Sequence, residues 1–356
     1  MISEIISSLR TSDILPLLIV FTIIYVANFY YHHFTRPNPL PGPIPIPILG
    51  NAYQLFGIGF NNFLTSMHKK YGDIYDLILG GQRIIVVCRP DLIENMHVPS
   101  TKTKYPFRFH LRPGITEYGL GGLGMFNNNN YQSWKFNRQF FTQAMMTPSF
   151  IHQSFEWTNE LCEEMEFYWN DLGENKELDL IKRMSRFTNE TIFKISTGIK
   201  NNALASYYNA LAPENFDSLS EREKERIEDS ENFINSILTY TGGIVSFMIC
   251  NKFVRHYIPY VRKHFNILLK NKDYFFDRIH NIIKVRRIEI ENTPLDRPLR
   301  HDMLTSFMTA NTPRDINAVK HADSDLLRPM TDKEIFGNIL DTMRGGTDTV
   351  SKFKFY

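Results

Sequence analysis

Near the carboxyl end of the chain, a glycine pair, an acid and a hydroxyl interrupt what otherwise reads as an apolar helix. The run is Arg344-Gly345-Gly346-Thr347-Asp348-Thr349. Adjacent glycines cost about 1–2 kcal/mol of helix propensity relative to alanine. A glycine notch beside a threonine hydroxyl lets a flat ligand approach the backbone and lets a proton reach that ligand. The alternative is a helix crossing that needs small residues, which explains the glycines but not Asp348.

A second set of side chains that can bind a ligand is the pair Trp134 and Arg138. Their spacing of four places both on one face of a helix. The guanidinium fork and the indole N–H can together bind two carboxylates or phosphates. In the alternative, Trp134 packs in the core and Arg138 pairs with a nearby acid. For the pair taken alone, this alternative is favoured.

Helical segments dominate the chain and must position both motifs. The sequence Thr331-Asp332-Lys333-Glu334 is a capping box that starts the last helix. Two β-prone runs, Ile74 to Leu79 and Arg83 to Cys88, flank Gly80-Gly81-Gln82 and predict a hairpin. Apolar periodicity predicts helices over residues 60–70, 92–97, 131–146, 155–170, 178–197, 227–238, 257–290 and 333–349. We therefore expect a mainly α fold with a small β-sheet.

Three connecting segments are unusual in length or composition. Residues Tyr105 to Asn130 hold several glycines and predict a long irregular loop, and Leu204 to Glu223 predict a polar one. The apolar, glycine-broken segment Thr239 to Cys250 is either a buried hairpin or a surface that enters a bilayer. Asn189-Glu190-Thr191 matches a glycosylation acceptor, but its helical pattern favours a chance match.

Composition excludes several classes of protein. The 356 residues are 43 % apolar and 13 % aromatic, which describes a globular chain rather than a disordered one. The 40 basic and 38 acidic side chains give a net charge of +2, so no strong field attracts nucleic acid. Cys88, Cys162 and Cys250 are far apart, which predicts free thiols in a reducing compartment and no metal site.

The amino terminus reads as a membrane anchor. Ile14 to Tyr31 is a run of eighteen residues without a formal charge, close to the length that crosses a bilayer. The run is too long for the apolar region of a signal peptide, so a retained anchor is the favoured interpretation. Only Arg10 and Arg36 flank it closely, so charge does not decide its orientation. Proline then occupies every second position from Pro37 to Pro47, which predicts a stiff, extended strut.

These features, in this order, resemble the amino-terminal two-thirds of a eukaryotic microsomal cytochrome P450. The residues that carry the resemblance are the anchor, Pro41-Gly42-Pro43, the pair Trp134 and Arg138, Asp302-Met303-Leu304-Thr305 and Gly345-Gly346-Thr347-Asp348-Thr349. The resemblance implies three parts: a membrane anchor over residues 1–36, a proline-rich strut over 37–49, and a partial catalytic domain over 50–356 that ends at the oxygen-activation helix. It implies the cytochrome P450 fold, incomplete at the C-terminus.

The resemblance also implies roles for the two motifs. Trp134 and Arg138 would bind the propionates of haem b, and Gly345 with Gly346 would line the oxygen groove. Thr349 would hydrogen-bond the dioxygen and Asp348 would feed protons toward it. The implied activity is a haem-dependent monooxygenase of a lipophilic substrate, which uses O2 and electrons from an NADPH-dependent cytochrome P450 reductase. The implied location is the endoplasmic reticulum membrane, with a single span and the body on the cytosolic side.

One departure from the family concerns the iron ligand. In the family, a cysteine thiolate in a glycine-containing loop near the carboxyl terminus holds the iron. No Phe-x-x-Gly-x-x-x-Cys pattern occurs here, and the Glu223 to Arg226 match to Glu-x-x-Arg precedes the last helix instead of following it. We therefore expect a fragment that shows no carbon-monoxide difference spectrum when expressed alone. The alternative is a non-catalytic membrane-anchored protein that keeps a cavity for hydrophobic ligands without an iron ligand.

Overall fold

The computed structural model describes residues 11–55, 57–97, 113–122, 124–126, 128–212, 217, 219–316 and 328–351. The side chains of residues 11–13, 95, 97 and 348–351 are not described. Two compact units make up the chain. The first comprises Met1–Pro106 and Met248–Ile258, and the second comprises Phe107–Phe247 and Pro259–Tyr356.

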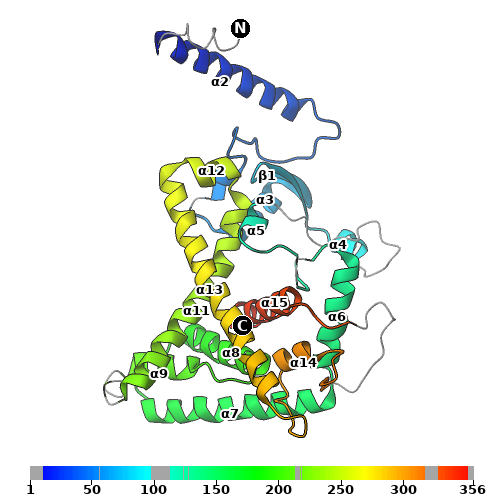
Figure 1. Cartoon of the computed structure of the whole chain (residues 1–356). Coiled ribbons are helices and arrows are strands. Elements are labelled where there is room, and N and C mark those ends of the chain that lie inside the picture. The colour runs from blue at the N-terminus through cyan, green and yellow to red at the C-terminus, as the bar shows by residue number, and fades with distance from the viewer. Residues whose placement is uncertain are drawn as a thin grey trace. The chain divides into compact units, whose positions relative to one another are not determined.

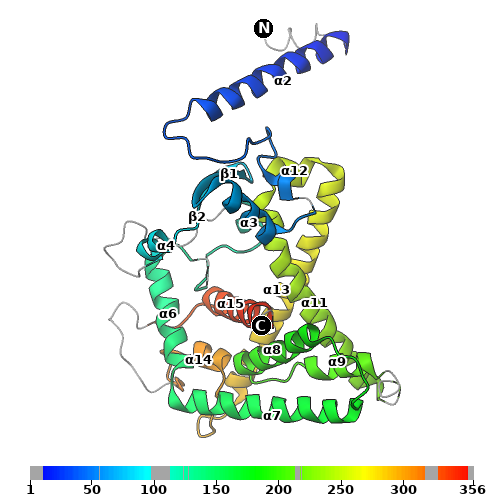
Figure 2. The same cartoon turned by 180° about the vertical axis from the view of Figure 1, so that it is seen from behind.

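The first unit begins with α2 (Thr11–Phe34), one continuous helix of 24 residues (Figures 1 and 2). Its stretch Ile14–Phe34 has a mean hydropathy of 2.0, and none of its most apolar window is buried. Length and composition therefore suit a membrane span, as the sequence predicts. Two histidines, His32 and His33, lie in its last turn.

The proline-rich segment then lies along the small sheet. The backbone N–H of Asp76 donates to the carbonyl of Pro41 at 2.9 Å. A Cβ added at Gly42 would lie 2.3 Å from the carbonyl oxygen of Asp76, so only glycine allows this close approach. The Asn51 side chain donates to the Pro43 carbonyl at 3.1 Å and accepts from the Ile78 N–H at 2.7 Å.

The predicted hairpin is confirmed. Strand β1 (Ile74–Leu79) pairs antiparallel with β2 (Gln82–Val87), from Ile74 opposite Val87 to Leu79 opposite Gln82. The two turn residues, Gly80 and Gly81, have φ of 60° and 79°, the left-handed conformation that tight hairpin turns need. The core beneath the sheet includes Phe63, Tyr75, Leu77 and Leu79. The helices of this unit besides α2 are η1 (Ala52–Leu55), α3 (Phe60–Tyr71), α4 (Pro90–His97) and α12 (Lys252–Tyr257).

The second unit is helical in the part that the structure describes. Its helices are α5 (Pro113–Glu117), α6 (Tyr131–Met145), α7 (Pro148–Leu172), α8 (Leu180–Thr197), α9 (Ala203–Leu211), α11 (Glu221–Ile249, of which the last two residues belong to the first unit), α13 (Pro259–Asn292), α14 (Met303–Thr309) and α15 (Asp332–Ser351). Side chains at Asn130, Thr147, Asp179 and Asp302 accept the free N–H groups at the starts of α6, α7, α8 and α14. These caps fix where each helix begins.

Two local expectations differ from the structure. The predicted polar loop over Leu204 to Glu223 contains α9, although residues 213–216 lie outside the described part. The segment Thr239 to Cys250 is not a hairpin, because α11 continues through it to Ile249, and its entry into a bilayer stays a prediction. A Cβ at Gly243 would lie 2.4 Å from the hydroxyl oxygen of Tyr118, so this glycine serves close packing within the helix. The helix predicted over 257–290 is present as α13, which begins two residues later, at Pro259, because the separate helix α12 ends at Tyr257.

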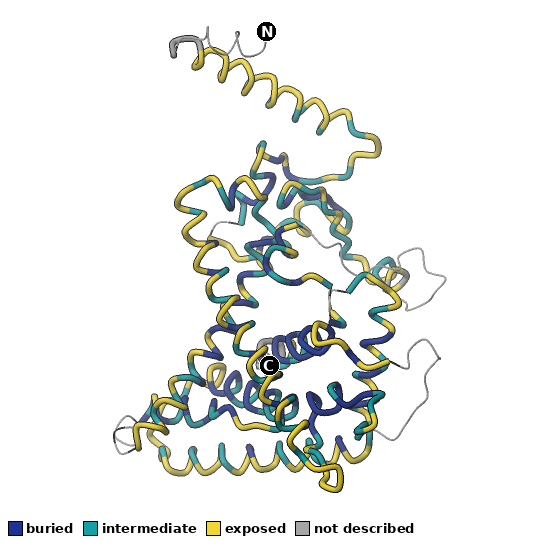
Figure 3. The backbone as a smooth tube through the Cα atoms, in the orientation of Figure 1, coloured by how far each residue is buried: buried dark blue, intermediate teal, exposed yellow. Residues whose placement is uncertain are grey.

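Helix α15 is the buried centre of the second unit (Figure 3). It lies alongside α8, where the Thr188 hydroxyl donates to the Thr347 carbonyl at 3.2 Å and the Asn189 amide donates to the Thr347 hydroxyl at 3.0 Å. Asn189 is 1 % exposed. The Asn189-Glu190-Thr191 sequence is therefore part of the helix packing, and its asparagine is inaccessible for glycosylation in the folded chain.

Candidate functional site

A capping box fixes the start of α15 and hence the position of its glycine pair. The Thr331 hydroxyl accepts from the Glu334 N–H at 3.3 Å, and the Glu334 carboxylate accepts from the Thr331 N–H at 2.8 Å. This confirms the box expected from the sequence. Burial raises the pKa of Glu334, but its bonds to Arg328 and Thr331 outweigh burial and hold the pKa below its usual value.

The two glycines of α15 have different surroundings. A Cβ added at Gly346 would lie 2.5 Å from Cγ1 of Ile192 on α8, so the helix crossing requires this glycine. Gly345 is exposed, and a Cβ there would meet no atom within 4 Å. Packing therefore explains Gly346, whereas contact with another described element does not explain Gly345. Asp348 and Thr349 lie in the last turn of α15, and their side chains lie outside the described ones.

Helix α6 carries Trp134 and Arg138. Trp134 is half-buried with its ring centroid 6.1 Å from that of Tyr131, and Arg138 is exposed. Among the described residues, no carboxylate pairs with the Arg138 guanidinium. The alternative in which Arg138 pairs with a nearby acid therefore has no support in the described part of the chain.

The two motifs lie on helices that contact each other. Asn137, adjacent to Arg138, is fully buried and accepts a hydrogen bond of 2.6 Å from the Asn338 amide of α15. The structure thus joins α6 to the first half of α15, whereas Gly345 lies two turns further along. The Asn338 side-chain oxygen is buried without a hydrogen-bond partner.

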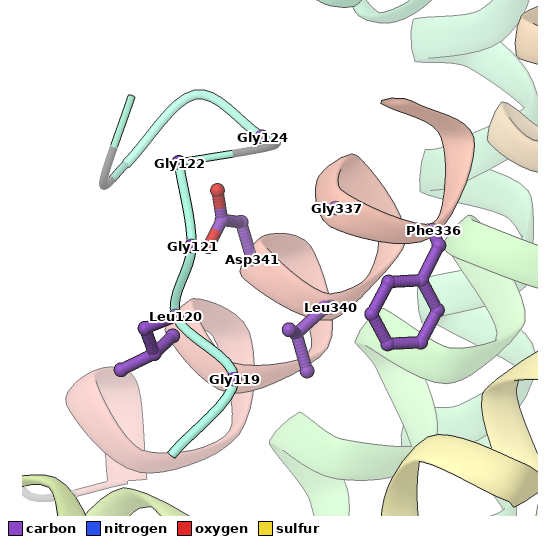
Figure 4. Close-up of a pocket in the computed structure, with 9 residues that line it drawn as sticks. All are labelled: Gly119, Leu120, Gly121, Gly122, Gly124, Phe336, Gly337, Leu340 and Asp341. Atoms are coloured by element: carbon purple, nitrogen blue, oxygen red, sulfur yellow. The ribbon is translucent and has the colours of Figure 1, made fainter. Parts of the chain in front are cut away.

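Sequence reasoning missed one residue of this region, Asp341. Its Oδ2 accepts the backbone N–H of Phe126 at 2.9 Å. A small cavity of about 20 Å³ beside it is shown in Figure 4. The residues that line this cavity are Gly119, Leu120, Gly121, Gly122, Gly124, Phe336, Gly337, Leu340 and Asp341. The volume is enough for about one water molecule.

Asp341 holds a glycine-rich loop against α15. A Cβ at Gly124 would lie 2.3 Å from Asp341 Oδ2 and 2.6 Å from the Gly337 carbonyl oxygen, so glycine is required there. Burial raises the pKa of Asp341, and the N–H of Phe126 and the charge of Arg344 only partly oppose this. The spacing of four between Asp341 and Gly345 could have indicated that they share a helical face.

Arg344 is the charged neighbour of Asp341 on the same helix. Its Nη2 lies 3.9 Å from Asp341 Oδ1, and its guanidinium lies 4.9 Å from the centroid of the Phe126 ring. The side chain is buried, and its Nη1 has no hydrogen-bond partner.

The three cysteines are free. Cys162 on α7 is exposed, and Cys88 and Cys250 are half-buried. Burial raises the pKa of Cys250, which disfavours its thiolate. Across the described residues, no group of three or more His, Cys, Asp or Glu side chains is placed to hold a metal ion.

Comparison with known proteins identifies the family. The family model described as "Cytochrome P450" matches residues 40–353, which include both motifs. The chain belongs to the cytochrome P450 family. It is similar to mouse cytochrome P450 2F2, with 24 % identity over 87 % of this chain and 55 % of the relative. It is also similar to the probable cytochrome P450 508A2 of Dictyostelium discoideum, with 31 % identity over 39 % of this chain and 28 % of the relative.

A solved cytochrome P450 shares the fold. The cyanobacterial CYP120A1, solved with retinoic acid bound, aligns with a TM-score of 0.59 over 88 % of this chain at 15 % identity. The chain spans 58 % of that structure, so it covers little more than half the length of the cytochromes P450 it matches most extensively. The expected mainly α fold with a small sheet is confirmed. Membership in the family implies a haem cofactor.

Proposed function

We propose that this chain forms part of a membrane-anchored monooxygenase that uses haem b, O2 and electrons from an NADPH-dependent cytochrome P450 reductase to oxidise a lipophilic substrate. The observation that carries the proposal is the family match over residues 40–353, which includes an exposed Arg138 to which the described residues offer no acid. The apolar helix α2 supports the anchor. The proposed location is the endoplasmic reticulum membrane, with the body on the cytosolic side.

The described residues fit a haem in two respects. Arg138 presents an exposed guanidinium whose planar fork matches a carboxylate, and the described residues offer no competing acid. At Gly345 an added Cβ would meet no described atom within 4 Å, so no described side chain fills the space beside it. When bound, the haem would supply the iron at which dioxygen is activated.

The residues of the chain would then hold the haem and deliver protons to the groove above it. Trp134 and Arg138 would hold the propionates from α6, each donating N–H groups to a carboxylate. Gly345 would add no side chain to the groove above the ring, whereas Gly346, predicted from the sequence to line the same groove, packs against Ile192 of α8. Thr349 would donate a hydrogen bond into this groove, and Asp348 would deliver protons to it.

The test uses the whole gene product that contains this chain, produced in cells supplied with haem and purified in detergent. We expect a carbon-monoxide difference spectrum of a thiolate-ligated ferrous haem. We also expect Arg138→Gln to lower the haem bound per chain several-fold, because one propionate loses its charged partner. The exposed Arg297 in the loop after α13 provides the matched control, Arg297→Gln.

Two results would contradict the proposal. A wild-type product that binds no haem removes the cofactor and with it the activity. Equal haem content in the Arg138 and Arg297 variants removes the propionate role of Arg138 and leaves the family assignment intact. Unfolding followed by tryptophan fluorescence shows whether a variant is folded, since Trp134, Trp157 and Trp169 all lie in the second unit.

A further inference from the structure

A basic groove lies within the first unit, between the carboxyl end of α2 and the hairpin. Its volume is about 410 Å³. The polar side chains that line it include Tyr25, Asn28, His32, Arg36 and Arg83. The size is in the range of pockets that bind small molecules, which is about 300–1,000 Å³.

The charges around this groove do not balance. One carboxylate, Asp76, pairs with both arginines: Arg83 Nε lies 2.7 Å and Arg36 Nη2 lies 3.1 Å from its Oδ2. Asp76 is 3 % exposed and is the only acid that the described part of the chain offers to either arginine. Two guanidinium groups against one carboxylate leave one positive charge in excess.

Several donors in the groove are also unused. Arg36 Nη1 lies 2.7 Å from Nδ1 of His33, and Nη2 donates to the Leu40 carbonyl at 3.3 Å, but Nε is buried and bonds to none of the described residues. Arg83 uses only Nε for Asp76, so among the described contacts its two terminal nitrogens are unbonded while its side chain is 37 % exposed. A guanidinium offers five N–H donors in a fork that matches a phosphate.

The position of the groove indicates which anion it meets. The candidate span ends at Phe34, and Arg36 follows two residues later. Basic residues directly after a membrane span lie at the depth of lipid phosphates, and pockets of this kind bind acidic headgroups. Exposed Tyr31, close to the carboxyl end of the span, suits the interfacial layer, where amphipathic rings concentrate.

We propose that this groove binds the headgroup of an anionic phospholipid, with the lipid phosphate on the free nitrogens of Arg83 and on Arg36. The inference rests on the membrane anchor of the proposed function and is independent of the haem. Asp76 holds the two arginines in place, and the excess positive charge favours a lipid with a net negative charge over a zwitterionic one. The acyl chains of the lipid would run along the exposed apolar face of α2.

The test measures lipid selectivity of the full chain in phosphatidylcholine vesicles. Electron spin resonance of spin-labelled phosphatidylserine and phosphatidylcholine gives the ratio of their association with the protein. We expect the wild type to favour phosphatidylserine about fivefold, the ratio that corresponds to about 1 kcal/mol per basic side chain. We expect Arg83→Gln to bring the ratio close to one and Arg83→Lys to restore most of it.

The matched control is Arg89→Gln. Arg89 follows β2, is exposed, pairs with Asp91 and does not line the groove. Its replacement should leave the ratio unchanged. The proposal is overturned by a wild type without selectivity, by an Arg83→Gln variant that keeps it, or by an equal loss in the Arg89 variant, which would show general surface attraction. A chain that inserts into no vesicle overturns the anchor as well, and the haem measurements above are unaffected by that outcome.

Discussion

Two buried aspartates of the second unit, Asp302 and Asp341, have similar partners. They differ in how many hydrogen bonds their carboxylates accept. Each accepts a backbone N–H and each lies near an arginine. Asp302 Oδ1 accepts the Thr305 N–H at 2.8 Å, and Oδ2 bonds to Arg286 and to the Thr305 hydroxyl. Arg286 in turn donates to the Thr197 carbonyl at 2.5 Å. This network joins α8, α13 and α14.

Asp341 has a looser arrangement. Its arginine, Arg344, lies 3.9 Å from Oδ1, and a cavity lies beside the carboxylate. Burial alone therefore does not make an acid–base pair structural; hydrogen bonds to both oxygens of its carboxylate do, and the Asp302–Arg286 pair is saturated in this sense. The unsaturated pair lies on the helix that carries Gly345, and the saturated pair lies outside that helix.

The largest expected effect breaks the saturated pair. Asp302→Ala removes the buried acid beside Arg286, which is 1 % exposed, and leaves the guanidinium only the partly exposed Glu289, 3.1 Å from its Nε. Loss of one partner of a buried pair costs about 3–5 kcal/mol of unfolding free energy. Urea unfolding of the detergent-solubilised chain, followed by tryptophan fluorescence, measures this loss.

A neighbouring exposed pair provides the control for that variant. Arg287, next to Arg286 on α13, pairs with Asp332, and their side chains are 43 % and 72 % exposed. Asp332→Ala should cost no more than about 1 kcal/mol. Similar losses in the two alanine variants would remove the distinction between saturated and exposed pairs.

An intermediate effect tests the loop that Asp341 holds. Gly124→Ala places a methyl group 2.3 Å from the Asp341 carboxylate, so the loop must shift, at a cost of about 1–3 kcal/mol. Gly121, three residues earlier, has no atom within 4 Å of an added Cβ, so Gly121→Ala should change stability by less than about 0.5 kcal/mol. Hydrogen exchange of the Phe126 N–H reports the loop directly. If this amide is equally protected in both variants, Asp341 does not hold the loop.

The sequence predicts those features that depend on residues close together in the sequence. Caps and periodicity place the helices, and Gly80 with Gly81 places the hairpin turn. The capping box at Thr331 starts α15 where the structure has it. Asp341 was missed because its partner Phe126 is 215 residues away in a long loop that has no local pattern. The two glycines of α15 could not be told apart for the same reason, since only the position of Ile192 on another helix separates them.

The smallest expected effect depends on pH and concerns the unsaturated acid. Burial raises the pKa of Asp341 in the folded chain above its unfolded value of about 4. Below both values the group is protonated in both states and does not affect stability. As pH rises through this window the unfolded state loses its proton first, so the wild type becomes less stable.

Asp341→Asn removes that titration while keeping an oxygen that can accept the Phe126 N–H. We expect the variant to match the wild type in stability near the ordinary carboxyl pKa and to become the more stable of the two toward neutral pH. The gain in unfolding free energy should be smaller than the losses predicted for Asp302→Ala and Gly124→Ala. Urea unfolding at a series of pH values measures the difference, and Asp296→Asn, at an exposed site in the loop after α13, controls for net charge. A difference that is constant with pH, or that favours the wild type as pH rises, would show that the Phe126 N–H and the charge of Arg344 fully compensate the burial of the Asp341 carboxylate.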